Sequence, residues 1–222
     1  MTSLLSGVVL AGTLMLQASG ALPAEGQTAS QALFRAARDG RPDEVRKLIG
    51  AGARVNTSTD HGLGKTLLIT AIEAGHADVV YVLLAANANV NLTNRSGWTP
   101  LMAAAEHGHR GLALTLIDRG ADVNATTSNG LTALMKGAVH GHAPIVRLLH
   151  ERGAKLNAAT DSGLTALMFA AWEGRVDVVK TLLALGADMH AKHRGTTTAL
   201  MGAEARGHKE TARLLRAAGL SK

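Results

Sequence analysis

The sequence contains no cysteine, few prolines and few aromatic side chains, and each scarcity excludes something. Without a single Cys in 222 residues, the chain has no disulfide framework, no thiol nucleophile and no cysteine ligand for a metal or a lipid. Aromatic residues make up 2% of the chain against 46% hydrophobic residues, so Ala, Leu, Val and Met must supply most of the buried surface. With 25 Gly and 4 Pro, this composition favours an elongated core of thin, closely packed layers.

The first part of the chain lacks charge altogether. No charged side chain occurs from Met1 to Ala24, and Leu4–Leu16 is an apolar stretch that is too short for a permanent membrane span but of the length found in signal peptides. We predict a signal peptide over residues 1–24, with cleavage after Ser19-Gly20-Ala21 or after Leu22-Pro23-Ala24. Because no Lys or Arg precedes the apolar stretch, an apolar helix that caps the domain is the alternative. We expect a periplasmic or secreted protein with no stable membrane anchor after signal cleavage.

The charge of the chain is basic but diffuse. The formal net charge is +6 and the sequence pI is about 10.1, which raises the possibility of nucleic-acid binding. However, Lys and Arg are spread along the chain with no basic run and no interleaved aromatic residues. We therefore expect no nucleic acid as a partner, and the charge favours an acidic protein or membrane surface.

Self-comparison reveals a period of 33 residues. A Thr recurs with a Leu two positions later and a Gly nine positions later, and this Gly is followed by His in four copies and by Arg in one. The Thr column is Thr66, Thr99, Thr132, Thr165 and Thr198, and the Gly column is Gly75, Gly108, Gly141, Gly174 and Gly207. Such agreement between independent columns is the signature of a repeat architecture.

These residues resemble the ankyrin repeat. Gly97-Trp98-Thr99-Pro100-Leu101-Met102-Ala103-Ala104-Ala105 and Gly120-Ala121-Asp122-Val123-Asn124 match its consensus segments nearly throughout. The resemblance implies an all-α solenoid of stacked helix pairs with projecting finger loops. It covers residues 30–219, which we divide into six repeats, at 30–60, 61–93, 94–126, 127–159, 160–192 and 193–219.

The resemblance also implies a role for each column. The Thr hydroxyl is expected to cap the first helix of each repeat, and the Gly to end it with a left-handed backbone. The His of the Gly-His pair is expected to begin the second helix and to form a local hydrogen bond. The family's His after Thr-Pro-Leu is replaced by apolar residues that should pack instead, namely Ile69, Met102, Met135, Met168 and Met201. The first finger is longer than the others, with its extra residues in His61-Gly62-Leu63-Gly64.

The sequence offers little support for a catalytic function. Gly62-Leu63-Gly64-Lys65-Thr66 imitates the end of a phosphate-binding loop but lacks its first Gly and a preceding strand. His107 and His140 are not consensus residues and lie one repeat apart, so a metal-binding or hydrolytic role through them is the alternative function. His190 and His193 form a second, weaker metal candidate. We predict no enzyme activity and no cofactor.

Partners of ankyrin repeats usually contact the finger tips and the exposed, concave side of the first helices. In this chain, residues before the Thr column and at the ends of the first helices depart from the polar pattern. The predicted partner-binding residues are Trp98, Glu106, His107, Leu131, Val139, His140, Leu164, Trp172 and Glu173. The alternative is that these side chains pack on neighbouring fingers and bind nothing.

The sequence therefore predicts a protein-protein interaction module. We expect a monomer that holds another protein in its concave groove and acts as a scaffold, an inhibitor or a protective partner. An immunity protein for one enzyme and a self-associating envelope component are the other roles that the sequence leaves open.

Overall fold

The computed structural model describes residues 25–59 and 64–220. The predicted signal peptide and the centre of the longer first finger, residues 60–63, lie outside the described residues. The described part contains twelve helices and no strand, which confirms the prediction of an all-α repeat solenoid. None of the helices in this part has the length and apolarity needed to cross a membrane.

The helices come in six pairs, each with an inner and an outer member. The inner helices are α1 (Glu25–Arg38), α3 (Leu67–Glu73), α5 (Pro100–Glu106), α7 (Ala133–Val139), α9 (Ala166–Trp172) and α11 (Ala199–Ala205), and all but α1 follow a residue of the Thr column. The outer helices are α2 (Pro42–Gly50), α4 (Ala77–Ala85), α6 (Arg110–Asp118), α8 (Ala143–Glu151), α10 (Val176–Ala184) and α12 (Lys209–Leu220). The first helix thus begins before the predicted start of the first repeat at residue 30.

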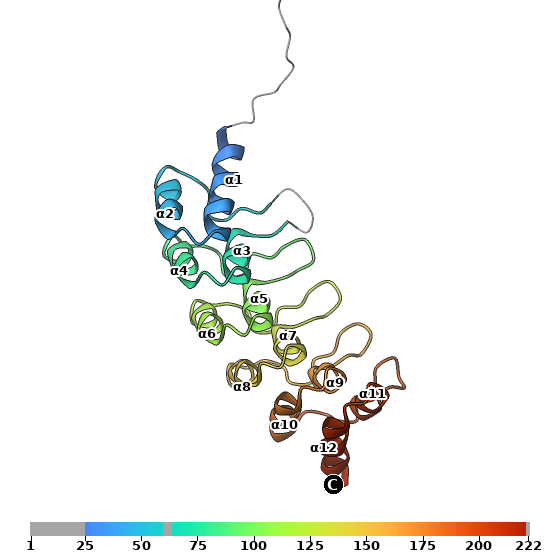
Figure 1. Ribbon diagram of the computed structural model, residues 1–222. Helices are drawn as coiled ribbons and strands as arrows, with labels where there is room; N and C mark the ends of the chain where they lie inside the picture. Colours follow the sequence, from blue (N-terminus) through green and yellow to red (C-terminus); the bar gives the residue numbers. More distant parts are fainter. Residues whose placement is uncertain (1–24, 60–63, 221–222) are drawn as a thin grey trace, which may run out of the picture.

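The pairs stack into an elongated molecule with α1 and α12 at opposite ends (Figure 1). Inner helices contact the inner helices of adjacent repeats, and most outer helices do the same among themselves. A finger loop leads from each outer helix to the next inner helix, and the fingers project on the side of the inner helices. Each layer therefore buries its apolar side chains against the next layer, as the composition predicted.

The Thr column caps the inner helices as predicted. Each Thr is extended, and its hydroxyl accepts a hydrogen bond from the backbone N–H three residues later, as between Thr132 and Met135 N at 3.2 Å. The Gly column also behaves as predicted, because Gly75, Gly108 and Gly141 all have φ between 75° and 84°. An inner helix of only 7 residues depends on such caps, since an isolated helix of this length is unstable in water.

The prediction of a local hydrogen bond for the Gly-His column is wrong. These histidines begin the outer helices, but their rings bond to the inner helix of the preceding repeat. Nε2 of His142 donates to the Glu106 carbonyl at 3.0 Å, and Nε2 of His208 donates to the Trp172 carbonyl at 2.9 Å. Arg175, the exception in this column, makes the same contact by donating Nε–H to the Val139 carbonyl at 2.9 Å. The column thus ties each repeat to its predecessor by satisfying a carbonyl at a helix end.

A second tie runs along the turns that follow the outer helices. The Asn124 side chain donates to the Gly153 carbonyl at 3.0 Å and accepts from the Lys155 N–H at 2.9 Å. Asn56, Asn91 and Asn157 occupy the same column, and each accepts from a backbone N–H of the next repeat at 2.7 to 2.9 Å. The Asn column is therefore a ladder of hydrogen bonds between repeats.

The residues that replace the family's His pack as expected in all repeats but the last. Ile69, Met102, Met135 and Met168 are at most 1% exposed, whereas Met201 is 50% exposed. In the described part of the chain, no further inner helix lies beside α11 on the side away from α9. The side chains on that side of α11 therefore stay in solvent.

Candidate protein-binding surface

The predicted partner-binding residues come from two places that the fold brings together. Trp98, Leu131 and Leu164 each precede a Thr cap and so lie at the base of a finger, and the others end the inner helices α5, α7 and α9: Glu106, His107, Val139, His140, Trp172 and Glu173. Because the inner helices stack side by side, these residues share one face of the molecule, which we call the inner surface.

Glu106 is the centre of a cluster that joins two repeats on the inner surface. Its carboxylate lies 3.2 Å from Nζ of Lys136, 3.3 Å from Nε2 of His140 and 4.0 Å from Nε2 of His107. The Glu106 side chain is 24% exposed and the two imidazoles are 38 to 40% exposed. One carboxylate therefore holds three basic side chains, two of which come from the following repeat.

The imidazoles of this cluster are also paired with the Gly-His column. The rings of His107 and His109 stack with centroids 5.9 Å apart, and those of His140 and His142 stack at 6.4 Å. Burial lowers the pKa of His140, and the opposing attraction of Glu106 does not compensate for it. Burial and the neighbouring His107 likewise lower the pKa of His109. Both effects favour the neutral imidazole at neutral pH.

Trp98 is held against the same cluster. The ammonium group of Lys136 lies 4.6 Å from the centre of the Trp98 ring, a cation-π contact. The indole is half-buried, and its N–H is buried without a hydrogen-bond partner. Lys136 thus links the Trp98 ring of one finger base to the Glu106 carboxylate.

Trp172 lies in a different environment, at the end of α9. Its indole occupies the space above Gly202 of α11, where any Cβ would overlap with Nε1 and Cδ1. His193 meets the ring edge-on at 5.5 Å, and the Arg206 guanidinium lies 5.6 Å from its centre. The Trp172 N–H, like that of Trp98, is buried without a partner. Trp172 therefore serves packing between the last repeats.

The aliphatic members of the set are half-buried. Leu131, Val139 and Leu164 have intermediate exposure, and Leu131 and Leu164 pack against the core. Among the described residues, the most exposed large hydrophobic side chains are Tyr81 and Met201, each 50% exposed. The inner surface thus offers parts of apolar side chains beside charged groups, and no wholly exposed apolar strip.

The charged groups of the inner surface neutralise one another. Besides the pair of Glu106 and Lys136, Lys65 lies 2.5 Å from Glu73, and Arg206 lies 2.5 Å from Glu173. These pairs leave the acidic and basic side chains of the surface largely compensated.

The alternative function through His107 and His140 gains no support from this geometry. In residues 25–59 and 64–220, no group of three or more His, Asp or Glu side chains is arranged to hold a metal ion. The second metal candidate, His190 with His193, falls under the same finding, since both residues are described.

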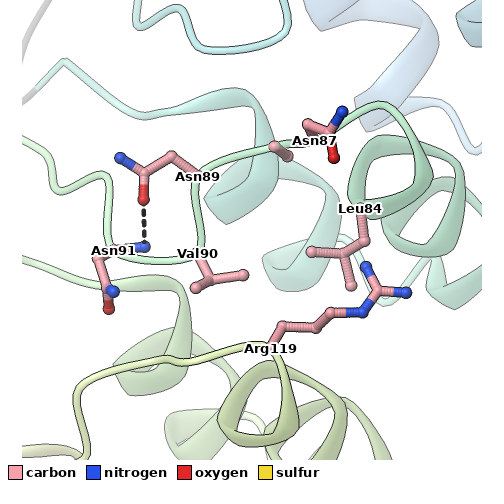
Figure 2. A pocket seen from close by; sticks show the side chains of 7 residues that line it. Leu84, Asn87, Asn89, Val90, Asn91 and Arg119 are labelled. Carbon is pink, nitrogen blue, oxygen red and sulfur yellow. Dashed lines mark hydrogen bonds between the residues drawn. The ribbon is translucent and has the colours of Figure 1, made fainter.

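A cavity of about 320 Å³ lies away from these residues, between the turn after α4 and the end of α6 (Figure 2). It is lined by Leu84, Asn87, Ala88, Asn89, Val90, Asn91 and Arg119. Its asparagines are engaged in the fold: Asn89 accepts from the Asn91 N–H at 2.9 Å, and Asn91 donates to the Gly120 carbonyl at 2.9 Å. The cavity is therefore a by-product of the asparagine ladder.

Sequence reasoning missed several residues of the inner surface. Lys136, Gly202 and Arg206 were not predicted, although Lys136 and Gly202 occupy the column of Ala103, where the family consensus has a variable residue. The sequence did carry a signal for these two positions, because a Lys and a Gly stand in a helix column that is otherwise filled by Thr70, Ala103 and Phe169. What each of them contacts depends on the tryptophans of neighbouring repeats, which no single column shows.

Comparison with known proteins gives one family. The family model described as ankyrin repeats (3 copies) matches residues 33–127 and 120–193 of the chain, which is well over half of its length. No curated protein matches the chain significantly.

Proposed function

This chain belongs to the ankyrin-repeat family, whose repeats bind other proteins, and from this premise we propose that it holds one protein partner on its inner surface. We further propose that it acts in the periplasm or outside the cell as a monomeric scaffold, inhibitor or protective partner. In this proposal residues 1–24 direct export, and the protein acts by binding alone, without catalysis.

The observation that carries the proposal is the cluster of Trp98, Lys136, Glu106, His107 and His140. All five residues keep part of their surface exposed or at intermediate exposure, and they contact one another across two repeats. Their mutual contacts fix their side chains before a partner arrives, which reduces the entropy lost on binding. A Trp beside charged groups is the kind of residue on which binding energy concentrates.

Neighbouring residues of the inner surface extend this cluster, so that a protein partner could contact more than one repeat. Leu131 and Leu164 continue the line of finger bases, and Val139 and Glu173 continue the line of helix ends. The paired charges present little repulsion to an approaching protein, while their exposed atoms remain available for hydrogen bonds at the rim of the interface.

The test compares two aromatic side chains on opposite sides of the stack. Trp98→Ala removes the proposed anchor on the inner surface, whereas Tyr81→Ala removes a 50% exposed aromatic from the outer helix α4. Each variant, cleaved of its signal, is used to capture partners from an extract of the source compartment, and affinity for the recovered partner is then measured. We expect Trp98→Ala to weaken binding by about thirtyfold, or about 2 kcal/mol, and Tyr81→Ala to leave it unchanged.

A control of the fold makes the result interpretable. Circular dichroism must show the same helix content in both variants, so that a loss of binding is not a loss of fold. Equal weakening by both substitutions, or by neither, would contradict the assignment of the inner surface.

A further inference from the structure

The last finger, which joins α10 to α11, differs in composition from the three fingers before it. Where those fingers carry Thr93, Thr126 and Ala159, the last finger carries Lys192, and where they carry Asn94, Thr127 and Thr160, it carries His193. Arg194 follows, and no Asp or Glu occurs from His190 to Thr198. Basic side chains are thus concentrated in one loop of a chain whose other cations are spread out.

The backbone of this finger also has a different turn. In each of these four fingers an N–H bonds back to the carbonyl three residues earlier, as from Gly163 to Thr160 at 2.8 Å and from Thr196 to His193 at 3.1 Å. In the first three of them the residue of positive φ is the last one of the turn, as at Gly163 with φ of 85°. In the last finger both central residues have positive φ, 49° at Arg194 and 74° at Gly195, which is the pattern of a type I′ turn.

Arg194 therefore occupies a left-handed position that Asn or Gly would adopt at lower cost. The only other described non-glycine residue with positive φ is Asn87, a residue suited to it. A long cation kept at a strained and exposed position points to a use for its side chain.

The basic finger is held firmly by its surroundings. Arg194 N–H donates to the Ser162 carbonyl of the neighbouring finger at 3.0 Å, and His193 N–H donates to the Thr197 carbonyl at 2.8 Å. The His193 ring rests edge-on against Trp172 at 5.5 Å. Lys192 and Arg194 are exposed and form no ion pair with any described residue, and the nearby Glu173 is already paired with Arg206.

We propose that the last finger binds an acidic segment, rich in Asp and Glu, of the protein partner. The proposal rests on the proposed protein-binding function and adds the chemistry of the partner: carboxylates would meet Lys192 and Arg194 while the rest of the partner lies on the inner surface. The fixed loop holds two unpaired cations on the same side of the stack as Trp172, so little order has to be gained on binding.

A protein segment fits this surface better than the other polyanions. Nucleic-acid binding draws on many phosphate contacts and on open aromatic faces for stacking, but the Trp172 ring is covered by Gly202, His193 and Arg206. Anionic membranes call for a broader basic patch or an additional apolar anchor, whereas here the cations occupy a single turn.

The first test measures binding of a fluorescein-labelled oligoglutamate peptide to the folded chain by fluorescence anisotropy. We expect the double variant Lys192→Gln/Arg194→Asn to weaken binding by about tenfold, because two charge-assisted contacts are lost. The matched control Arg147→Gln/Lys180→Gln removes two exposed cations from the outer helices α8 and α10, and should change binding less than about twofold.

Equal weakening in both double variants would overturn the proposal, since it would indicate attraction to net charge alone. Tighter binding of oligothymidylate or of phosphatidylserine vesicles than of oligoglutamate, with the same dependence on Lys192 and Arg194, would overturn it in favour of nucleic acid or membrane. Loss of the captured partner with Trp98→Ala but not with Lys192→Gln/Arg194→Asn would reject the last finger and leave the inner surface intact. Retention of the partner by both would reject the proposed function itself.

The second test separates stability from binding. Arg194→Asn relieves the left-handed backbone and should raise Tm by about 2 °C while it weakens binding of the peptide. Asp161→Asn, at the same column of the preceding finger where φ is not positive, should leave Tm unchanged. A fall in Tm for Arg194→Asn would show that the arginine stabilises the fold, and would remove the argument from strain.

Discussion

The internal repeats and the last repeat of this protein are built from the same columns but use them differently. In the internal repeats, Asn124 bonds forward to the next turn, and Met135 is 1% exposed beneath its neighbours. Towards the end of the stack the Asn column holds His190, in the fifth repeat, and the Met column holds the 50% exposed Met201, in the sixth. The Asn and Met columns thus serve contacts between repeats, and each changes near the last repeat of the described chain.

The same comparison holds for the two tryptophans. Trp98, in the internal part, lies beside a cluster of charged side chains with Lys136 over its ring. Trp172, at the end, lies on Gly202 and is covered by His193 and Arg206. One indole therefore belongs to the cluster proposed for binding, and the other packs between the last two repeats.

The largest difference in stability between an internal and a last repeat is expected for substitutions in the Met column, the column that replaces the family's His. Met135→Ala removes a fully buried side chain from the middle of the stack and should lower the free energy of unfolding by about 2–5 kcal/mol. Met201→Ala removes a half-exposed side chain and should cost less than about 1 kcal/mol. Urea denaturation of both variants, followed by circular dichroism at one protein concentration, measures the two values. Similar losses at the two positions would mean that α11 is covered in solution, for example by a second copy of the chain.

A smaller loss of stability is expected when the contact between Trp172 and Gly202 is disturbed. Gly202→Ala places a methyl group where the indole lies, so the ring must move or α11 must shift, at a cost of about 1–3 kcal/mol. Tryptophan fluorescence and urea denaturation report the displacement and its cost.

Gly111 offers the matched control for this prediction. It lies in the outer helix α6, and no neighbouring atom lies within 4 Å of the position that a methyl group would take there. Ala is favoured over Gly in a helix by about 1 kcal/mol, so Gly111→Ala should stabilise the protein slightly. If Gly202→Ala behaved in the same way, the contact between Gly202 and Trp172 would not exist in solution.

The resemblance to the ankyrin repeat, found through the period of 33 residues, was sufficient to predict the helix pairs, the Thr caps and the Gly turns. These features are local, because each depends on residues within one turn of helix or loop, such as Thr132 and Met135. The direction of the His contacts was not predictable in this way. A column shows that His142 and His208 are equivalent, but not that each reaches back to the preceding repeat.

The candidate site was predictable in its membership more than in its contacts. The columns placed Glu106, His107 and His140 in the predicted set, the two histidines as departures from the consensus, and the structure joins them around one carboxylate. Whether a side chain such as Leu131 is exposed or half-buried depends on the curvature of the stack and on the lengths of neighbouring side chains. The turn at Arg194 did leave a signal, since Gly195 stands one position earlier than Gly97, Gly130 and Gly163 do in their fingers.

The smallest expected difference concerns the asparagine ladder. Asn124→Ala removes one hydrogen bond to Gly153 and one from Lys155 and should lower the free energy of unfolding by about 1–2 kcal/mol. His190→Ala changes the exposed last member of the column, for which no such bonds are found in the described part, and should cost less than about 0.5 kcal/mol. Because each ladder bond joins two repeats, Asn124→Ala should also broaden the unfolding transition by weakening the coupling between the two halves of the stack. A cost at position 190 equal to that at position 124 would show that the ladder continues past the last finger, and the contrast between internal and last repeats would then hold for the Met column alone.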